Sequence, residues 1–268
     1  MLDKIRSKYI LSLIFINIKE KQKLKIILNN KKLQERLEIT LEMIKKVSGK
    51  FLVCENGISK IYLQNYGKSK LIFEGEYKDK KKIRGKEYNF DGKIIFDGEY
   101  VNNKRKKGKV YQNSSLIFEG EIINDKFWLG KKKEYNNDGY IKLETDIIDG
   151  EKTGSAKEYL FNGKLFFEGE YLNGIRNGYG KEYNSCKDLL FEGEYLNGKR
   201  WEGIGKVLNI NEKLIYNGTY FKGKYWDGIF FDNGKEYQIN NGTGYVVEND
   251  VFGELAFNGY YKNGNRLV

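Results

Sequence analysis

The chain has 268 residues with no histidine, no proline and only two cysteines, and its formal net charge is +11. The lack of histidine excludes imidazole zinc sites, Ser-His triads and histidine general bases. Cys54 and Cys186 are too few and too far apart for a disulfide framework or a CxxC metal site. We therefore expect free thiols in a reducing compartment, with the protein either free in the cytoplasm or peripheral to a membrane.

The positive charge is concentrated at the beginning of the chain. Residues 1–50 carry 13 Lys plus Arg against 5 Asp plus Glu, a net charge of +8, whereas residues 51–268 carry 35 against 32, a net charge of +3. A basic head suits an anionic partner, either a nucleic acid or a membrane surface. The Lys- and Asn-rich composition of the whole chain explains the same excess, and we favour this explanation. A nucleic-acid partner is not expected.

Residues 1–50 are predicted to form three short helices. They contain no glycine before Gly49, and their apolar residues recur at helical spacing. The longest apolar run, residues 9–18, is too short to span a bilayer, which needs roughly 20 residues. Charged residues follow this run where a signal peptide would have its cleavage site, so we interpret it as a buried helix.

The order of features in residues 7–37, SKYILSLIFINIKEKQKLKIILNNKKLQERL, resembles a degenerate F-box. The family's usual opening Leu-Pro is missing. The resemblance implies docking onto the adaptor of a cullin-type ubiquitin ligase, with contacts from the apolar residues Leu13, Ile14, Phe15, Leu24 and Ile27. Three helices that only cap the repeat array described next explain the same pattern, and we favour capping.

From about residue 71 the chain repeats the phrase Phe-Glu-Gly-Glu-Tyr in degenerate copies. The central glycines are Gly75, Gly98, Gly120, Gly169, Gly193, Gly218 and Gly259. One decayed copy, residues 143–147, has Thr145 in the place of glycine, and the steps from 75 to 218 are then 23, 22, 25, 24, 24 and 25 residues. Such a period indicates an array of units that bury their surface against their neighbours.

Each repeat is predicted to be one β-hairpin. The phrase alternates apolar and polar residues as a strand does, and turn signals such as Asn173-Gly174 and Asn197-Gly198 follow it. The expected fold is mainly β: an elongated single-layer antiparallel meander of seven or eight hairpins of about 23–25 residues. This array would occupy residues 51–268, after the helical segment of residues 1–50.

Aromatic residues recur two positions before and two positions after the central glycine. The period of two puts them on one face of the sheet, where rings can lie over the bare glycine backbone of a neighbouring strand. We interpret this column as a structural spine rather than a base-stacking surface. It comprises Phe73, Tyr77, Phe96, Tyr100, Phe118, Phe167, Tyr171, Phe191, Tyr195, Tyr216, Tyr220 and Phe257.

The best-kept copy reads Phe191-Glu-Gly-Glu-Tyr195, Asn197-Gly-Lys-Arg200 and Gly203-Ile-Gly205, and it is similar to MORN repeats. The resemblance covers about three quarters of the chain. Two departures are that the first position is usually Phe rather than Tyr, and that the family's usual His is replaced. The resemblance implies scaffold or dimerisation modules, in some members with phospholipid-binding surfaces, and no enzymatic activity.

Two lysine-rich turns in neighbouring copies could supply such a phospholipid-binding stripe. Stacked hairpins would bring them to one edge of the sheet, although solvated turns are often lysine-rich without any function. The residues concerned are Lys80, Lys81, Lys82, Lys104, Arg105 and Lys106.

No feature of the sequence indicates catalysis. Carboxylates such as Glu168 and Glu170 recur in most copies, which argues against a unique catalytic pair, and each glycine belongs to a hairpin rather than to a phosphate loop. We predict no catalytic, cofactor or metal site. The expected function is a protein-interaction scaffold, with a ubiquitin-ligase adaptor and a membrane tether that binds anionic phospholipid as the alternatives.

Overall fold

The computed structural model describes residues 50–55, 57–65 and 68–267. The helical segment predicted for residues 1–50 lies outside this range except for Lys50, and so do the five proposed adaptor contacts. The described residues form twenty β-strands and no helix, which confirms the mainly β prediction. The chain divides into two compact units between residues 115 and 116, called unit 1 and unit 2 below.

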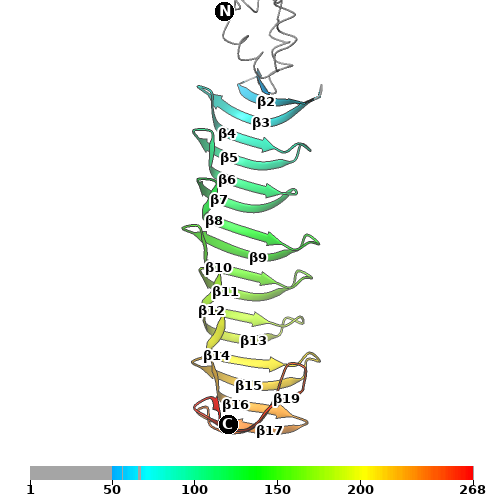
Figure 1. Ribbon diagram of the computed structural model, residues 1–268, viewed down its shortest axis with the longest axis vertical. Coiled ribbons are helices and arrows are strands. Elements are labelled where there is room, and N and C mark those ends of the chain that lie inside the picture. The colour runs from blue at the N-terminus through cyan, green and yellow to red at the C-terminus, as the bar shows by residue number, and fades with distance from the viewer. Residues whose placement is uncertain (1–49, 56, 66–67, 268) are drawn as a thin grey trace, which may run out of the picture. The chain divides into compact units, whose positions relative to one another are not determined.

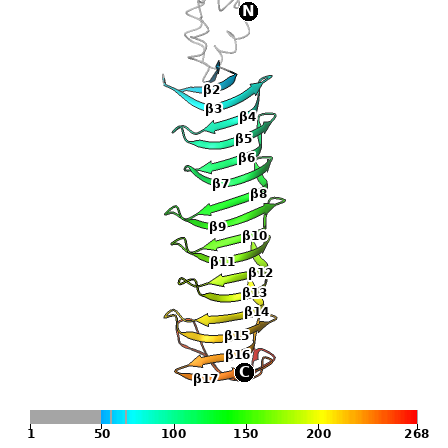
Figure 2. The same ribbon diagram turned by 180° about the vertical axis from the view of Figure 1, so that it is seen from behind.

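Strands β1 to β17 belong to one long antiparallel sheet, and β18 to β20 form a separate three-stranded sheet (Figures 1 and 2). Within each unit, strands that are successive in sequence pair as hairpins, as predicted. The prediction of a single layer to the end of the chain is wrong for the last three strands, for a reason given below.

The described residues of unit 1 form six strands. Their bounds are β1 Lys50–Glu55, β2 Ile58–Asn65, β3 Lys68–Lys78, β4 Lys81–Tyr88, β5 Ile94–Val101 and β6 Lys104–Gln112. The hairpin of β1 and β2 carries no copy of the repeated phrase, so the repeat pattern did not identify it.

Unit 2 contains the other strands, the first of which begins one residue before the boundary. Their bounds are β7 Ser115–Ile123, β8 Lys126–Tyr135, β9 Ile141–Ile148, β10 Glu151–Tyr159, β11 Leu165–Leu172, β12 Ile175–Tyr183, β13 Leu189–Leu196, β14 Lys199–Leu208, β15 Leu214–Phe221, β16 Lys224–Asp232, β17 Lys235–Ile239, β18 Gly244–Asn249, β19 Leu255–Lys262 and β20 Asn265–Arg266.

The core of the sheet lies where an aromatic ring covers a pair of facing glycines. Gly169 of β11 lies opposite Gly180 of β12, and a Cβ atom on Gly169 would lie 2.7 Å from Cζ of Phe167. The Phe167 side chain is 0% exposed. A single sheet can therefore bury a large ring, because the missing glycine side chains leave the space for it. We call this side of the sheet the ring face and the opposite side the polar face.

The decayed copy shows the same complementarity in reverse. Leu143 replaces the ring, Thr145 replaces the central glycine, and Ala156 of β10 lies opposite Thr145. All three side chains are buried. Because leucine is shorter than phenylalanine, the space beneath Leu143 can hold the side chains of Thr145 and Ala156.

Most two-residue turns lie at one edge of the sheet, which we call the turn edge. Gly174, Gly198 and Gly223 have positive φ angles, and each donates its backbone N–H to a carbonyl of the preceding hairpin, at 2.8, 2.8 and 2.9 Å. The recurrent Asn-Gly pair thus closes its own hairpin and also attaches that hairpin to the one before it.

The opposite edge of unit 2, the loop edge, carries mostly five-residue loops. In these loops the first residue is usually Asn, and its Oδ1 accepts two backbone N–H groups. Asn136 accepts from residues 138 and 140, and Asn209 accepts from residues 211 and 213. These bonds define the loops locally, before any tertiary contact.

The last three strands fold back over the ring face of β15–β17 (Figure 1). Val246 and Tyr261 pack there against Tyr216, Phe230 and Ile239 in one buried cluster. Earlier in unit 2, Tyr195 and Tyr220 of the next copy cover the Phe167 and Phe191 rings, but after β17 no further copy continues the sheet. Folding back buries these last rings, and this need is why the layer does not stay single.

Candidate functional site

The predicted aromatic column lies on the ring face. In unit 1, the Tyr100 ring centroid lies 5.2 Å from Phe96 and 5.7 Å from Phe73 of the preceding copy. In unit 2, Tyr195 joins Phe191 and Phe167 in the same way, at 5.1 and 5.2 Å. The pairs are edge-to-face, the geometry that aromatic rings prefer.

The burial of this column limits what it can bind. Eight of its members are buried, namely Phe73, Phe96, Phe118, Phe167, Phe191, Tyr216, Tyr100 and Tyr195. The other four, Tyr77, Tyr171, Tyr220 and Phe257, are half-buried. Rings that face one another in this way leave little surface on which a base could stack.

A carboxylate on the ring face connects successive copies of the repeat. Glu182 accepts a hydrogen bond from the Tyr195 hydroxyl at 2.9 Å and one from Nε of Arg200 at 3.1 Å. Arg176 of the preceding copy lies 3.8 Å away, and the Arg200 guanidinium lies 5.0 Å from the Phe191 ring centroid. Burial opposes the Arg200 charge, but Glu182 outweighs burial and raises the pKa of Arg200.

The same arrangement recurs in both units. Glu158 accepts from Arg176 and from the Tyr171 hydroxyl, and Glu248 accepts from Arg266 and Tyr261. Such partly buried, hydrogen-bonded ion pairs specify the stacking of one hairpin on the next.

In unit 1 this arrangement involves two of the predicted lipid-binding residues. Lys82 Nζ and Arg105 Nη2 each lie 2.6 Å from a carboxylate oxygen of Glu87. Both residues lie on the ring face, because they are opposite ring-face tyrosines in the strand pairing. Lys82 and Arg105 are therefore not free for lipid.

The stability of the protein should fall at acid pH because of these carboxylates. Burial would raise the pKa of Glu87 and of Glu158, but Lys82 and Arg105 on the first and Arg176 on the second outweigh burial and lower it. A carboxyl group with a lowered pKa in the folded state gives stability above its unfolded pKa of about 4.3, and loses it as pH falls through the folded value. Urea unfolding from pH 7 to 3 should show a falling midpoint below about pH 5. A constant midpoint would contradict this prediction.

The polar face of unit 2 carries an alternating row of lysines and glutamates. Lys133 pairs with Glu144 at 2.6 Å, Lys157 with Glu168 at 3.7 Å, and Lys181 with Glu192 at 3.1 Å. Tyrosine hydroxyls add to it, with Tyr159 donating to Glu144 and Tyr183 to Glu168. Each of these carboxylates already has partners within the sheet.

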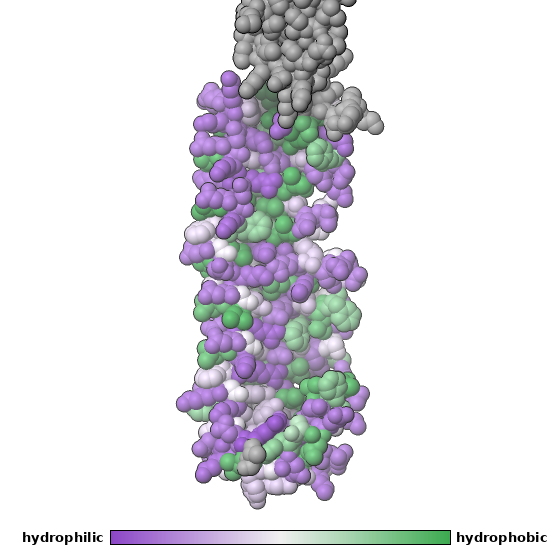
Figure 3. All heavy atoms as spheres, viewed as in Figure 1, coloured by the Kyte–Doolittle hydropathy of each residue, from purple (hydrophilic) through white to green (hydrophobic). Residues whose placement is uncertain are grey.

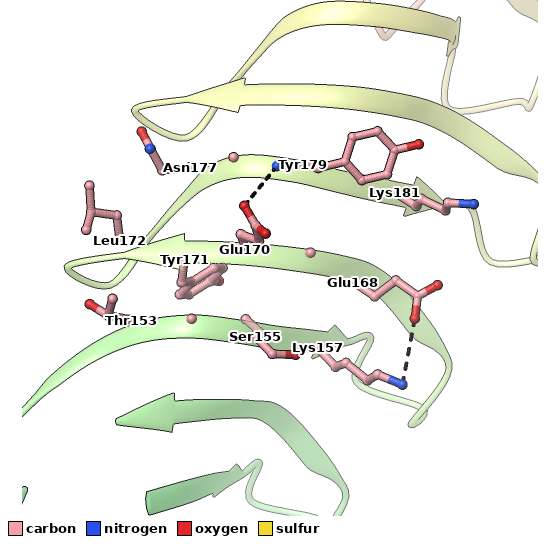
Figure 4. A pocket seen from close by; sticks show the side chains of 14 residues that line it. Thr153, Ser155, Lys157, Glu168, Glu170, Tyr171, Leu172, Asn177, Tyr179 and Lys181 are labelled. Atoms are coloured by element: carbon pink, nitrogen blue, oxygen red, sulfur yellow. Dashed lines mark hydrogen bonds and ion pairs between the residues drawn. The ribbon is translucent and has the colours of Figure 1, made fainter. Parts of the chain in front are cut away.

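A groove of about 670 Å³ lies on the polar face over β10–β12 (Figure 4). The Glu168–Lys157 pair lies at one side of it, and Glu170 accepts the backbone N–H of Tyr179 at 3.3 Å. The groove is therefore lined by residues of the alternating row of lysines and glutamates and by the strand irregularities beside that row. Within the described residues no three His, Cys, Asp or Glu side chains could hold a metal ion.

The two lysine-rich turns of unit 1 lie side by side. Lys81 Nζ donates to Asn102 Oδ1 at 3.0 Å, and the backbone N–H of Lys82 donates to Asn103 Oδ1 at 2.8 Å. Four of the six predicted lipid-binding residues are exposed here, namely Lys80, Lys81, Lys104 and Lys106.

The two units differ in charge. Residues 50–115 contain 16 Lys plus Arg against 8 Asp plus Glu, a net charge of 16 − 8 = +8. Residues 116–268 contain 20 against 24, a net charge of 20 − 24 = −4. The excess positive charge of the array thus lies in unit 1, and an anionic surface would favour this unit over unit 2.

The loop edge of unit 2 exposes apolar side chains that sequence reasoning missed. Tyr140, Phe161, Ile210 and Phe252 are 53%, 79%, 64% and 66% exposed. Figure 3 shows hydrophobic atoms gathered along this side of unit 2. The available signal was the presence of large apolar residues next to turn-forming Asn, Asp and Gly, where polar residues are the rule.

Hydrogen bonds join these loops to one another. Asn136 Nδ2 donates to the Phe161 carbonyl at 2.9 Å, Lys164 Nζ to the Ser185 carbonyl at 2.9 Å, and the backbone N–H of Ile210 to the carbonyl of residue 251 at 2.8 Å. The loops that carry the exposed apolar side chains are therefore connected to one another by hydrogen bonds.

Comparison of the chain with protein-family models and with curated proteins gives no match. In the part of the chain that the structure describes, no helix is long and apolar enough to cross a bilayer.

Proposed function

We propose that this chain is a non-catalytic scaffold of the MORN type that holds a protein partner along the loop edge of unit 2. The observation that carries the proposal is the row of exposed apolar tips at Tyr140, Phe161, Ile210 and Phe252. Large exposed aromatic side chains are the usual anchors of protein interfaces, and a row of them on a soluble protein marks an interaction site.

The framework beneath the tips supports the same proposal. Each loop is held by Asx hydrogen bonds, and neighbouring loops bond to each other. Binding to such preorganised loops costs little conformational entropy, so a few apolar anchors can give useful affinity.

The test is affinity capture with the full chain carrying Phe161→Asp and Phe252→Asp. We expect the proteins retained by the unchanged chain to be lost, because two charges would be placed in the apolar contact. The control is Leu172→Asp, which changes an exposed apolar residue at the turn edge. The control should keep both the partners and the thermal midpoint. Retention of all partners by the double variant would refute the loop-edge proposal.

An anionic membrane surface is the second candidate function, and the lysine-rich turns of unit 1 favour it. Lys80, Lys81, Lys104 and Lys106 are exposed on two adjacent, hydrogen-bonded turns within residues 50–115, a segment of net charge +8. Each lysine near an anionic surface contributes about 1 kcal/mol of binding free energy.

Changing these four lysines to glutamate should reduce binding to phosphatidylserine vesicles by a factor on the order of 1000. High salt should act in the same direction. The matched control changes four exposed lysines of unit 2, namely Lys126, Lys199, Lys222 and Lys262, to glutamate. If both variants bind vesicles equally well, unit 1 is not a lipid-binding surface.

A further inference from the structure

The chain contains ten Asn-Gly pairs, and these pairs are chemically labile. The deprotonated glycine nitrogen can attack the asparagine Cγ; a new C–N bond forms, the bond to the side-chain nitrogen breaks, and ammonia leaves. Water then opens the cyclic imide to aspartate or isoaspartate. A glycine N–H that donates a hydrogen bond must lose that bond before it can react, so hydrogen-bonded pairs are protected.

Most of the pairs in the described residues are protected in this way. At the turn edge, Gly174 and Gly198 donate to the preceding hairpin at 2.8 Å. At the end of the chain, Gly242 and Gly264 donate at 2.7 and 2.8 Å, and in a five-residue loop Gly163 donates to a carbonyl within its own loop at 2.9 Å.

Three further pairs lie inside strands, where a paired neighbour restrains the backbone. Gly178 is opposite Tyr195, Gly218 is opposite Gly205, and Gly259 is opposite Val246. Asn56 of the pair at 56–57 lies outside the described residues.

The remaining pair, Asn233–Gly234, forms the turn between β16 and β17. Both residues are exposed, with φ angles of +48° and +79°. Among the Asn-Gly turns that the structure describes, this one has a glycine N–H without a hydrogen-bond acceptor. A Cβ on Gly234 would meet nothing within 4 Å, so the turn is also open to water.

The position of this turn explains the difference. Two-residue turns at the turn edge bond to the preceding hairpin, and five-residue loops at the loop edge bond internally. The Asn233–Gly234 turn is a two-residue turn at the loop edge, so neither kind of bond is available to it. We infer that Asn233–Gly234 is the preferred site of spontaneous deamidation in the folded protein, and that its product loosens the C-terminal sheet.

The second part of this inference rests on Asp232. Its Oδ1 accepts from Asn233 Nδ2 at 3.0 Å and from Asn249 Nδ2 of β18 at 2.8 Å. Deamidation replaces the first donor with a second carboxylate beside Asp232. Isoaspartate also adds a methylene to the main chain of a two-residue turn. Both changes disturb the contact through which the turn holds β18.

The first experiment follows deamidation of the full-length protein at neutral pH by peptide mass spectrometry. The rate at each asparagine is divided by its rate in urea, where all pairs are unfolded. We expect the normalised rate at Asn233 to exceed those at Asn173 and Asn197 by about tenfold, which corresponds to about 1.4 kcal/mol. A ratio below about threefold, or a faster reaction at either of the other two, overturns the inference.

The second experiment compares Asn233→Asp with the matched variant Asn197→Asp in a turn-edge turn. Amide hydrogen exchange at Val246 and Val247 of β18 should accelerate in the first variant and stay unchanged in the second. Unchanged exchange in Asn233→Asp overturns the proposed loosening of the C-terminal sheet.

Discussion

Gly169→Ala should destabilise the folded protein by ~3 kcal/mol, the upper range for overpacking a filled core. The added Cβ would lie 2.6 Å from Cα of Gly180, 2.7 Å from the Tyr179 carbonyl oxygen and 2.7 Å from the Phe167 ring. Two of these three atoms belong to the backbone, so a change of side-chain rotamer cannot relieve the clash. Urea unfolding followed by tryptophan or tyrosine fluorescence measures the loss.

The decayed copy supplies the control for this prediction. There Leu143 lies above Thr145, and Ala156 lies opposite it. Combining Phe167→Leu with Gly169→Ala should therefore cost less than the sum of the two single changes, by about 1 kcal/mol. Strictly additive losses would mean that the ring and the glycine are not coupled.

Glu182→Ala should also destabilise the protein by ~3 kcal/mol, the lower range for removing one partner of a buried ion pair. The change leaves the half-buried guanidinium groups of Arg176 and Arg200 without this carboxylate, and it removes the acceptor of the Tyr195 hydroxyl. The Glu182 side chain is only 15% exposed, so water cannot replace the lost contacts. Thermal and urea unfolding both measure the effect.

Glu192→Ala is the matched control on the polar face. Glu192 pairs with Lys181 at 3.1 Å, but both side chains are more than a third exposed. Such an exposed pair contributes little to stability, and added salt should diminish its contribution further. Equal losses of stability for Glu182→Ala and Glu192→Ala would show that ion pairs on the ring face do not contribute more stability than those on the polar face.

The repeated phrase was sufficient to predict the hairpins. In Phe191-Glu-Gly-Glu-Tyr195 the alternation of residues predicted a strand with two faces, and Asn197-Gly198 predicted the turn after it. The structure has β13 and β14 at these positions. These features are local, since strand periodicity and turn conformation depend on residues close together in sequence. The hairpin of β1 and β2 lacks the phrase, so its strands were not predicted individually, although the predicted array of residues 51–268 includes nearly all of it.

The candidate surfaces were harder to predict, because exposure depends on the surroundings of a residue. Lys81 and Lys82 are neighbours in one lysine run, but Lys81 is exposed while Lys82 is bound to Glu87 on the ring face. Phe161 and Phe167 are both phenylalanines of one repeat, yet the first is 79% exposed and the second is fully buried. Residue type alone does not distinguish the members of such pairs.

The sequence by itself determined the period, the strands, the turns and the column of rings over glycine, because each of these follows from local spacing and from side-chain size. Only the tertiary structure decided that β18–β20 fold back over the last rings and that Glu182 joins successive copies. It alone also decided that the tips of the loop edge remain uncovered. These features depend on which surfaces are left exposed once neighbouring hairpins have packed, and burial of apolar area between distant residues determines that outcome.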